Sequence, residues 1–237
     1  MARVEGVHWW WTARRSIIDT MIARMGLPQG AQILEGGCGT GGNLAMLARH
    51  GSVHAFEPDA GARALALQHG NQADVRAGSL PDDVSVADGS MHLVALFDVL
   101  EHIDDDHRAL ARLRRCLRPR GQLLLTVPAA PWLWSSHDVV LHHRRRYTLA
   151  SAIAVVRAAG FSIRYASHAN ALLLPIAVAE RTHAAIFKRA PRPAALPPAP
   201  VNRLLRRVFA AECRFHAHAR ARLPYGLSII IWAERGP

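Results

Sequence analysis

The sequence predicts an α/β fold built on a mostly parallel sheet. Between residues 31 and 127, short apolar runs typical of strands alternate with helical patterns. A glycine-rich turn directly follows the first run, and residues 91–97 are apolar on both faces, as a central parallel strand requires. Because parallel strands are joined by helices, this alternation indicates βαβ units.

The expected elements follow one another in regular order. We expect strands at residues 31–34, 52–56, 73–77, 91–97 and 122–127. We expect helices between them at residues 44–50, 61–69 and 104–117. In the last of these helices, Leu110, Leu113 and Leu117 recur on one face. A long loop rich in Pro, Trp, His and Arg then spans residues 128–147.

The C-terminal part adds two strands and an insertion. Thr148 caps a helix that ends at Gly160, and residues 161–167 form a strand. Residues 169–223 hold an apolar helix, a proline-rich linker at 191–200 and a basic helix at 201–222, in which Arg203, Arg207 and Arg214 share a face. The last strand lies at 227–233.

The length of 237 residues, half of them apolar, suits one domain with a sizeable core. We expect an N-terminal helical lid at residues 1–30, a cofactor-binding core at 31–168, a helical cap at 169–223 and a final strand at 224–237.

Composition narrows the cellular setting. The three cysteines, Cys38, Cys116 and Cys213, are too few for a disulfide framework and lack the CxxC spacing of a structural zinc site, so we expect a cytoplasmic protein. The N-terminus lacks the features of a signal peptide, and no apolar run is long enough to cross a membrane. Residues 141–237 hold 16 of the 29 Lys and Arg residues but three of the 18 acids. This asymmetry indicates either an anionic partner or a biased composition.

The stretch from Ile33 to Leu44, ILEGGCGTGGNL, places a carboxylate, a glycine cluster and a helix start directly after a strand. No Lys follows, which excludes a Walker phosphate loop. Gly37, Gly39 and Gly42 also fit the G-x-G-x-x-G pattern of a nicotinamide dinucleotide site, with Glu57 in the ribose-binding place. Glu35 argues against that site, because its carboxylate opposes a pyrophosphate and favours a cationic ligand.

The same stretch resembles motif I of the class I S-adenosylmethionine-dependent methyltransferases. Four further matches follow in order: FEPD at 56–59, GSLP at 78–81, FDVLEH at 97–102 and LRPRGQ at 117–122. FDVLEH is similar to the branch that includes quinone-biosynthesis enzymes. The resemblance implies a Rossmann-like, seven-stranded sheet in the order 3-2-1-4-5-7-6, with helices on both faces and the last strand antiparallel.

The resemblance also implies S-adenosylmethionine as cofactor and S-adenosylhomocysteine as product. It assigns cofactor binding to a set of motif residues: Glu35, Gly37, Cys38, Gly39, Gly41, Asn43, Glu57, Pro58, Ser79, Leu80, Phe97, Asp98, Val99 and His102. Ser79 departs from the family, which usually has Asp there, so Asp82, Asp83 or the backbone takes over that contact.

The methyl transfer is an in-line displacement, which needs alignment and sometimes a base. Catalytic candidates are His102 and His137, which follow the fourth and fifth strands. Substrate-binding candidates are the aromatic and cationic residues near that edge: Trp10, Trp11, Trp134, His142, Arg145, Arg146 and Tyr147. No metal is expected, because the histidines lack the helical spacing of a metal site. His216 and His218 are expected on the surface.

The function expected is methyl transfer to a small, partly apolar acceptor, and an anionic or lipid-linked acceptor is left open. Residues 169–223 would offer a peripheral membrane contact. Two alternatives stay open. An RNA methyltransferase would use the basic C-terminal half to bind RNA. The Pro-Pro-Tyr motif that acts on base amines and any recognisable RNA-binding domain are absent from the sequence, which argues against a nucleic-acid substrate. The other alternative is a protein that binds the cofactor without turnover. The oligomeric state and the acceptor atom are left open.

Overall fold

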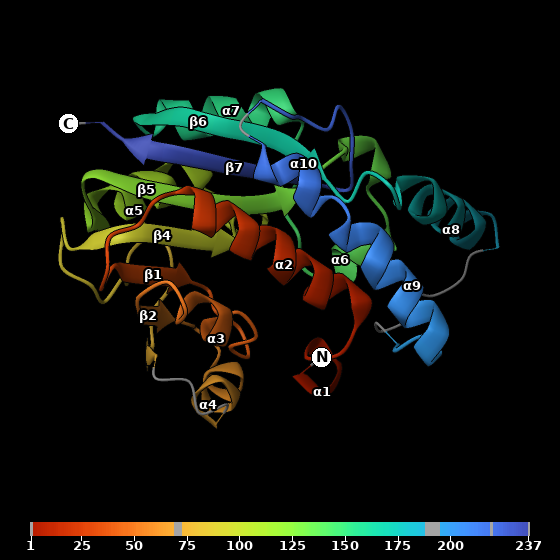
Figure 1. Ribbon diagram of the computed structural model, residues 1–237, viewed down its shortest axis with the longest axis horizontal. Coiled ribbons are helices and arrows are strands. Elements are labelled where there is room, and N and C mark those ends of the chain that lie inside the picture. The colour runs from red at the N-terminus through yellow and green to blue at the C-terminus, as the bar shows by residue number, and fades with distance from the viewer. Residues whose placement is uncertain (1, 69–72, 188–194, 219, 237) are drawn as a thin grey trace.

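The computed structural model, which describes residues 2–68, 73–187, 195–218 and 220–236, has seven strands in one sheet (Figure 1). Their order, β3-β2-β1-β4-β5-β7-β6, confirms the predicted topology. The strands are β1 (Gln32–Gly36), β2 (Ser52–Phe56), β3 (Asp74–Arg76), β4 (Met91–Phe97), β5 (Leu117–Pro128), β6 (Phe161–Ala169) and β7 (Ser228–Arg235). β7 runs antiparallel to both β5 and β6, and the other pairs are parallel.

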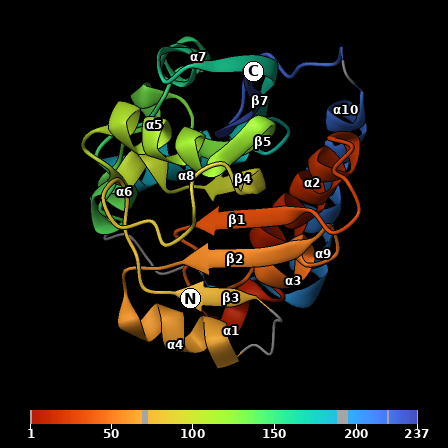
Figure 2. The ribbon, with the colours of Figure 1, turned by 90° about the vertical axis from the view of Figure 1, so that its left-hand side faces the viewer.

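Helices cover both faces of the sheet (Figure 2). The helices are α1 (Ala2–Glu5), α2 (Trp9–Arg24), α3 (Leu44–Leu47), α4 (Ala60–Gln68), α5 (Asp106–Cys116), α6 (Ser136–Val140), α7 (Leu149–Ala158), α8 (Leu174–Ile186), α9 (Ala199–Ala210) and α10 (Cys213–Ala217), with short 3-10 turns η1 (Leu100–His102) and η2 (Pro131–Leu133). None of the helices in the described part of the chain has the length and apolar character that a membrane-crossing helix needs.

Alternation along the strands gives the molecule two cores. Leu34 packs with the α5 residues Leu110 and Leu113 on one face of the sheet. Its neighbour Ile33 belongs to the core on the other face, with Ile18 of α2. Successive strand residues point to opposite faces, so a central strand that is apolar throughout is buried on both.

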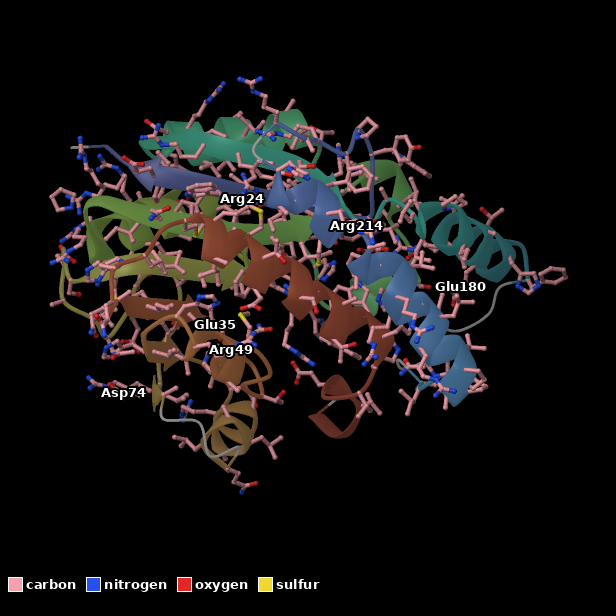
Figure 3. All side chains as sticks on the ribbon, viewed as in Figure 1. Arg24, Glu35, Arg49, Asp74, Glu180 and Arg214 are labelled. Carbon is pink, nitrogen blue, oxygen red and sulfur yellow. The ribbon has the colours of Figure 1, made fainter. Side chains whose placement is uncertain are left out.

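The helices of the C-terminal half differ from the expected ones. The basic helix ends at Ala210 instead of continuing to 222, so Arg214 belongs to α10 (Figure 3) and does not continue the face of Arg203 and Arg207. The break lies at Glu212, which is fully buried and accepts hydrogen bonds from the backbone N–H groups of residues 170–172 at 2.6, 2.8 and 2.9 Å.

Smaller differences concern lengths. The helix after the glycine motif ends at Leu47 rather than at residue 50, and the expected loop at 128–147 contains η2 and α6. Of the expected proline-rich linker, residues 191–194 lie outside the described residues, and α9 already begins at Ala199. His69, the expected end of the second helix, also lies outside them.

The insertion between β6 and β7, which we call the cap (residues 170–223), begins at the carboxyl end of β6. β6 is parallel to β5, because both are antiparallel to β7. The cap therefore starts at the edge of the sheet where the parallel strands end. Open α/β sheets bind their ligands at this edge.

Candidate functional site

The loop that follows β1 turns sharply on three glycines. Gly37, Gly39 and Gly41 have φ angles of 64°, 56° and 85°, a region that favours glycine. A Cβ on Gly37 would lie 2.9 Å from Cγ2 of Val99. A Cβ on Gly39, by contrast, would meet no atom within 4 Å. The backbone at Gly39 is therefore open to a ligand.

Glu57, at the end of β2, is fixed beside this loop. The N–H of Gly39 donates to its Oε2 at 2.8 Å and the N–H of Asp59 donates to its Oε1 at 3.0 Å. Each carboxylate oxygen can accept a further hydrogen bond. The arrangement suits a ligand with two neighbouring hydroxyl groups.

Glu35, the penultimate residue of β1 (Figure 3), is a buried carboxylate with an incomplete set of partners. Asn43 Nδ2 donates to its Oε1 at 2.8 Å, and Oε2 has no hydrogen-bond partner among the described residues. Burial raises the pKa of Glu35 to about 7, against the lowering effect of the Asn43 bond and the positive charge of Arg14. A cation would satisfy the unpartnered oxygen.

A third carboxylate, Glu5 of α1, was not expected from the sequence. The hydroxyl of Thr40 donates to its Oε2, and a Cβ on Gly42 would lie 2.0 Å from its Oε1. Negative charge on Glu5 and Glu57 adds to the raised pKa of Glu35. No sequence pattern marks Glu5, because only the packing of α1 brings it to the glycine loop. Three carboxylates thus surround one loop.

Arg14 of α2 is a second residue outside the expected site. Its guanidinium forms an ion pair with Asp98 Oδ2 at 2.7 Å and donates to Thr126 Oγ1 at 2.8 Å. It also lies over the rings of Trp10 and Phe97, at 5.1 and 5.6 Å from their centroids. Arg14 therefore brings the predicted residues Trp10, Phe97 and Asp98 together at the ends of β4 and β5.

The turn after β3 is held by its backbone. The N–H of Ser79 donates to the carbonyl of Asp83 at 2.7 Å, and the N–H of Asp83 donates to the carbonyl of Ser79 at 2.8 Å. Leu80 lies inside this turn, and the side chains of Ser79 and Pro58 are exposed. Asp82 pairs with Arg108 and is not free to replace the missing carboxylate of the motif.

Near the loop after β4 lies a cluster of histidines and carboxylates. The His102 and His143 rings meet edge to face at 4.9 Å, and His143 Nε2 lies 3.9 Å from Oε1 of the fully buried Glu101. Asp138 accepts from His143 Nδ1 at 3.0 Å. Burial lowers the pKa of His102. His137, the other catalytic candidate, is on α6 beside Asp138, and burial lowers its pKa as well.

The expected substrate-binding residues fall into three groups. Arg145, Arg146 and Tyr147 have their polar atoms engaged within the protein: Arg145 and the Tyr147 hydroxyl contact Asp106 at 3.0 and 2.9 Å, and Arg146 contacts Asp138 at 2.7 Å. These three residues fasten the loop after α6.

The remaining candidates lie in two places. Trp134 and His142 line a pocket of about 460 Å³ together with Val139, His143 and Arg144. Trp10 and Trp11 lie on α2, with their ring centroids 5.6 Å apart. The structure thus brings Trp134 and His142 into one cavity and keeps the two α2 tryptophans apart as a separate aromatic pair.

Comparison with known proteins identifies the family to which the chain is similar. A family model described as a methyltransferase domain matches residues 10–180. A Mycolicibacterium smegmatis protein named as a probable S-adenosylmethionine-dependent methyltransferase is 27% identical over 159 residues, which cover 65% of this chain and 60% of that protein. The ubiquinone biosynthesis O-methyltransferase of Xanthomonas campestris pv. campestris (strain B100) is 36% identical over 117 residues, covering 46% of this chain and 47% of that protein. The matches therefore span only about half of these relatives.

Solved structures share the fold. An S-adenosylmethionine-dependent methyltransferase from Mesorhizobium loti aligns over 96% of this chain and 98% of its own, with a TM-score of 0.61 and 16% identity. The geranyl diphosphate C-methyltransferase from Streptomyces coelicolor A3(2) aligns over 94% of this chain and 79% of its own, with a TM-score of 0.63 and 13% identity. At these identities the likeness concerns the fold alone.

The residues around the glycine loop fit the methyl donor that this family uses. An open backbone at Gly39, a paired acceptor at Glu57 and an unpartnered oxygen on Glu35 suit a nucleoside that carries a cationic methionine group. Since the family match covers most of the sheet and all of the glycine loop, the chain belongs to the methyltransferase-domain family, the class I S-adenosylmethionine-dependent methyltransferases.

Proposed function

We propose that this protein transfers the methyl group of S-adenosylmethionine to a hydroxyl group of a small, partly apolar acceptor. The observation that carries the proposal is the acidic surround of the glycine loop, where Glu5, Glu35 and Glu57 converge and Arg14 is engaged by Asp98. An anionic pyrophosphate would be repelled there, whereas an ammonium and a sulfonium would be attracted.

Each residue of the glycine-loop side has a distinct task in this proposal. Glu57 accepts hydrogen bonds from the two ribose hydroxyls, and Gly39 leaves room for the methionine backbone. Glu35 offers its unpartnered Oε2 to the positive charge. When bound, S-adenosylmethionine supplies an electrophilic methyl group, whose bond to sulfur breaks as the bond to the acceptor oxygen forms.

The acceptor side is the pocket of about 460 Å³ that Trp134, Val139 and His142 help to line. Its aromatic and aliphatic walls suit an apolar ring, and Arg144 suits an anionic substituent. His137 lies on the same helix as Val139, and burial lowers the pKa of its imidazole. In the proposal His137 takes the proton from the acceptor hydroxyl. The name of the Xanthomonas relative, an O-methyltransferase, supports oxygen as the acceptor atom.

The cap would help an amphiphilic or lipid-linked acceptor to reach this pocket. Arg203, Arg206 and Arg207 of α9 are exposed, and no ion pair engages them among the described residues. Leu204, between them, is 61% exposed. Exposed arginines and leucine on one helix suit an anionic membrane surface.

Thermal unfolding with candidate ligands tests the proposed cofactor. S-adenosylmethionine and S-adenosylhomocysteine should raise the melting temperature of the protein, because a ligand that binds only the folded state stabilises it. NAD should leave the melting temperature unchanged. Stabilisation by NAD and not by the two sulfur compounds would overturn the proposal.

The matched variant is Gly39→Val. A side chain at residue 39 would fill the open space in front of the loop, so the variant should fold but lose the ligand-induced stabilisation. The strain of a non-glycine residue at a φ of 56° lowers its melting temperature without ligand, which the ligand-free measurement records. An unchanged ligand effect in this variant would show that the ligand binds elsewhere.

A further inference from the structure

Glu101 has no arginine or lysine partner among the described residues. It is 0% exposed, and neither carboxylate oxygen has a hydrogen-bond partner among the described residues. The positive charges of Arg14 and Arg146 act on Glu101, but these arginines are already paired with Asp98 and Asp138, at 2.7 Å each. An ionised carboxylate that is buried without a partner is strongly unfavourable. Such a group either stays protonated or meets a cation, and both oxygens of Glu101 are unpartnered among the described residues.

Two imidazoles lie beside Glu101. The ligand atoms of Glu101, His102 and His143 are all within 4.8 Å of one another, and Oε1 of Glu101 lies 3.9 Å from Nε2 of His143. Glu101 and His102 are neighbours in η1, whereas His143 comes from the loop after α6. The three groups converge from two separate segments.

The two rings are oriented by partners behind them. Asp138 accepts a hydrogen bond from Nδ1 of His143 at 3.0 Å, which leaves Nε2 turned toward Glu101. Asp138 is itself buried and held by the N–H of Ser135 at 3.0 Å. Nδ1 of His102 faces the carbonyl of His142 at 3.3 Å. A carboxylate or carbonyl behind a histidine is the usual support of a metal-binding imidazole.

We propose that Glu101, His102 and His143 bind a divalent transition-metal ion of the zinc class. Two imidazoles and one carboxylate are ligands that zinc and its neighbours prefer over the oxygen-seeking magnesium and calcium ions. Ligand atoms around such an ion lie roughly 3 Å apart. The separations of 3.9 to 4.8 Å require the three side chains to close by about 1 Å on binding.

The position of the site indicates that the ion would activate the acceptor, and this part of the inference rests on the proposed function. His143 also lines the pocket of about 460 Å³, so an open coordination position would face the acceptor side. A metal ion lowers the pKa of a bound hydroxyl group and fixes the direction of its oxygen. His102 would then be a ligand rather than a base, and His137 would remain the candidate to take the hydroxyl proton.

The sequence offered little signal for this site, although Glu101 and His102 are adjacent and His142 and His143 share one loop. Metal-binding histidines are usually recognised by close spacing on a helix, but 41 residues separate His102 from His143. The expectation of no metal followed from that spacing alone.

Metal titration of the tag-free, chelator-treated protein tests the site without cofactor or acceptor. Zn²⁺ should bind at one ion per chain and raise the melting temperature. Co²⁺ should give the visible absorption of a site with nitrogen and oxygen ligands and no thiolate band, because Cys38, Cys116 and Cys213 all lie outside the cluster. Absence of stoichiometric binding of both ions at micromolar concentrations would overturn the proposal.

Variants locate the ion. Glu101→Gln and His143→Ala should each weaken Zn²⁺ binding at least tenfold, and Asp138→Asn should weaken it roughly 10- to 100-fold by releasing the His143 ring. His183→Ala, on α8, is the matched control and should bind as the unmodified protein does. If a cluster variant fails to fold, the Co²⁺ spectrum of the unmodified protein still decides. Equal Zn²⁺ affinity in His143→Ala and His183→Ala would place the ion elsewhere and overturn the assignment.

The two proposals fail separately. Metal binding without any stabilisation by S-adenosylmethionine would contradict the proposed function and leave the metal site standing. Stabilisation by S-adenosylmethionine without metal binding would contradict the metal site and leave the proposed function standing.

Discussion

Two carboxylates beside the glycine loop, Glu35 and Glu57, differ in how they are held. Glu57 accepts hydrogen bonds from two backbone N–H groups, whereas Glu35 accepts one from Asn43 and keeps an unpartnered oxygen. Glu57 is therefore oriented to accept hydrogen bonds from hydroxyl groups. The unpartnered oxygen of Glu35 is available to a positively charged group. Substitution separates these two roles.

Glu57→Ala should weaken cofactor binding by about 2–4 kcal/mol. It removes two hydrogen bonds to a charged acceptor, each worth ~1.5–3 kcal/mol with partial replacement by water. Isothermal titration calorimetry with S-adenosylhomocysteine measures the change. Glu234→Ala, on the distant strand β7, serves as control. A dissociation constant that rises less than threefold would show that the ribose is bound by other residues.

Glu35 should make cofactor binding depend on pH. Its pKa of about 7 in the ligand-free protein means that the carboxyl group is mostly protonated below that pH. A cationic ligand binds the ionised form more tightly, so affinity for S-adenosylmethionine should rise about tenfold between pH 6 and pH 8 and level off above. The charges of Arg14, Glu5 and Glu57 also act on the pKa of Glu35: Arg14 lowers it, and the two carboxylates raise it.

Glu35→Gln is the control for this pH dependence. The amide does not titrate, so any remaining slope belongs to the ligand's own amino group, which titrates equally in both proteins. The raised pKa also makes the ligand-free protein lose stability as the pH rises through about 7, and the Gln variant should lack that loss. The same slope in both proteins would contradict a role for Glu35.

At the scale of elements, α9 presents two different surfaces. Phe209 is buried and meets the ring of Trp9 on α2 at 6.2 Å, whereas Arg203, Arg206 and Arg207 face solvent. Because the helix ends at Ala210, Arg214 does not extend this basic surface. The three arginines of α9 are the group to test.

Replacing Arg203, Arg206 and Arg207 together by Gln should reduce binding to vesicles that contain phosphatidylglycerol. The loss should be largest at low salt, because salt screens exposed charges. Sedimentation with vesicles measures it, and vesicles of phosphatidylcholine alone are the control. The melting temperature and cofactor affinity should stay unchanged, since these side chains are exposed. If the triple variant sediments with these vesicles as the unmodified protein does, the three arginines do not bind anionic lipid and only reflect the arginine-rich composition of the chain.

At the scale of the whole molecule, the cap is fastened to the N-terminal segment and folds back on its own first residues. Asn202 of α9 accepts from the N–H of Trp9 at 2.8 Å and donates to the carbonyl of Val7 at 2.9 Å. Glu212 holds the start of the cap through three backbone N–H groups. The helices α9 and α10 of the cap therefore pack against α2.

Glu212→Ala should lower the free energy of unfolding by roughly 3–5 kcal/mol, because it leaves buried N–H groups at residues 170–172 without an acceptor. Urea denaturation measures the change. Glu180→Ala removes an exposed carboxylate from α8 (Figure 3) and should change the free energy by less than about 0.5 kcal/mol. Similar values for both variants would show that the cap contributes little to stability.

The sequence alone determined the sheet and the glycine-loop side of the site. Strand–helix alternation predicted a parallel sheet, and the family resemblance carried by the ordered motifs implied the strand order. Glu35, Gly39 and Glu57 lie around one loop. These features are readable because each depends on a few consecutive residues at the end of one strand, and parallel strands bring such ends to the same edge.

Only the tertiary structure decided which side chains meet across long separations. It paired Arg14 with Asp98, placed Glu5 on the glycine loop, and engaged Arg145 and Arg146 with acids. It also buried His216, expected on the surface, against the Tyr165 hydroxyl at 3.0 Å. Such contacts depend on how α1, α2 and the cap pack against the sheet. A local pattern records which face of a helix is apolar but not which residue lies opposite it.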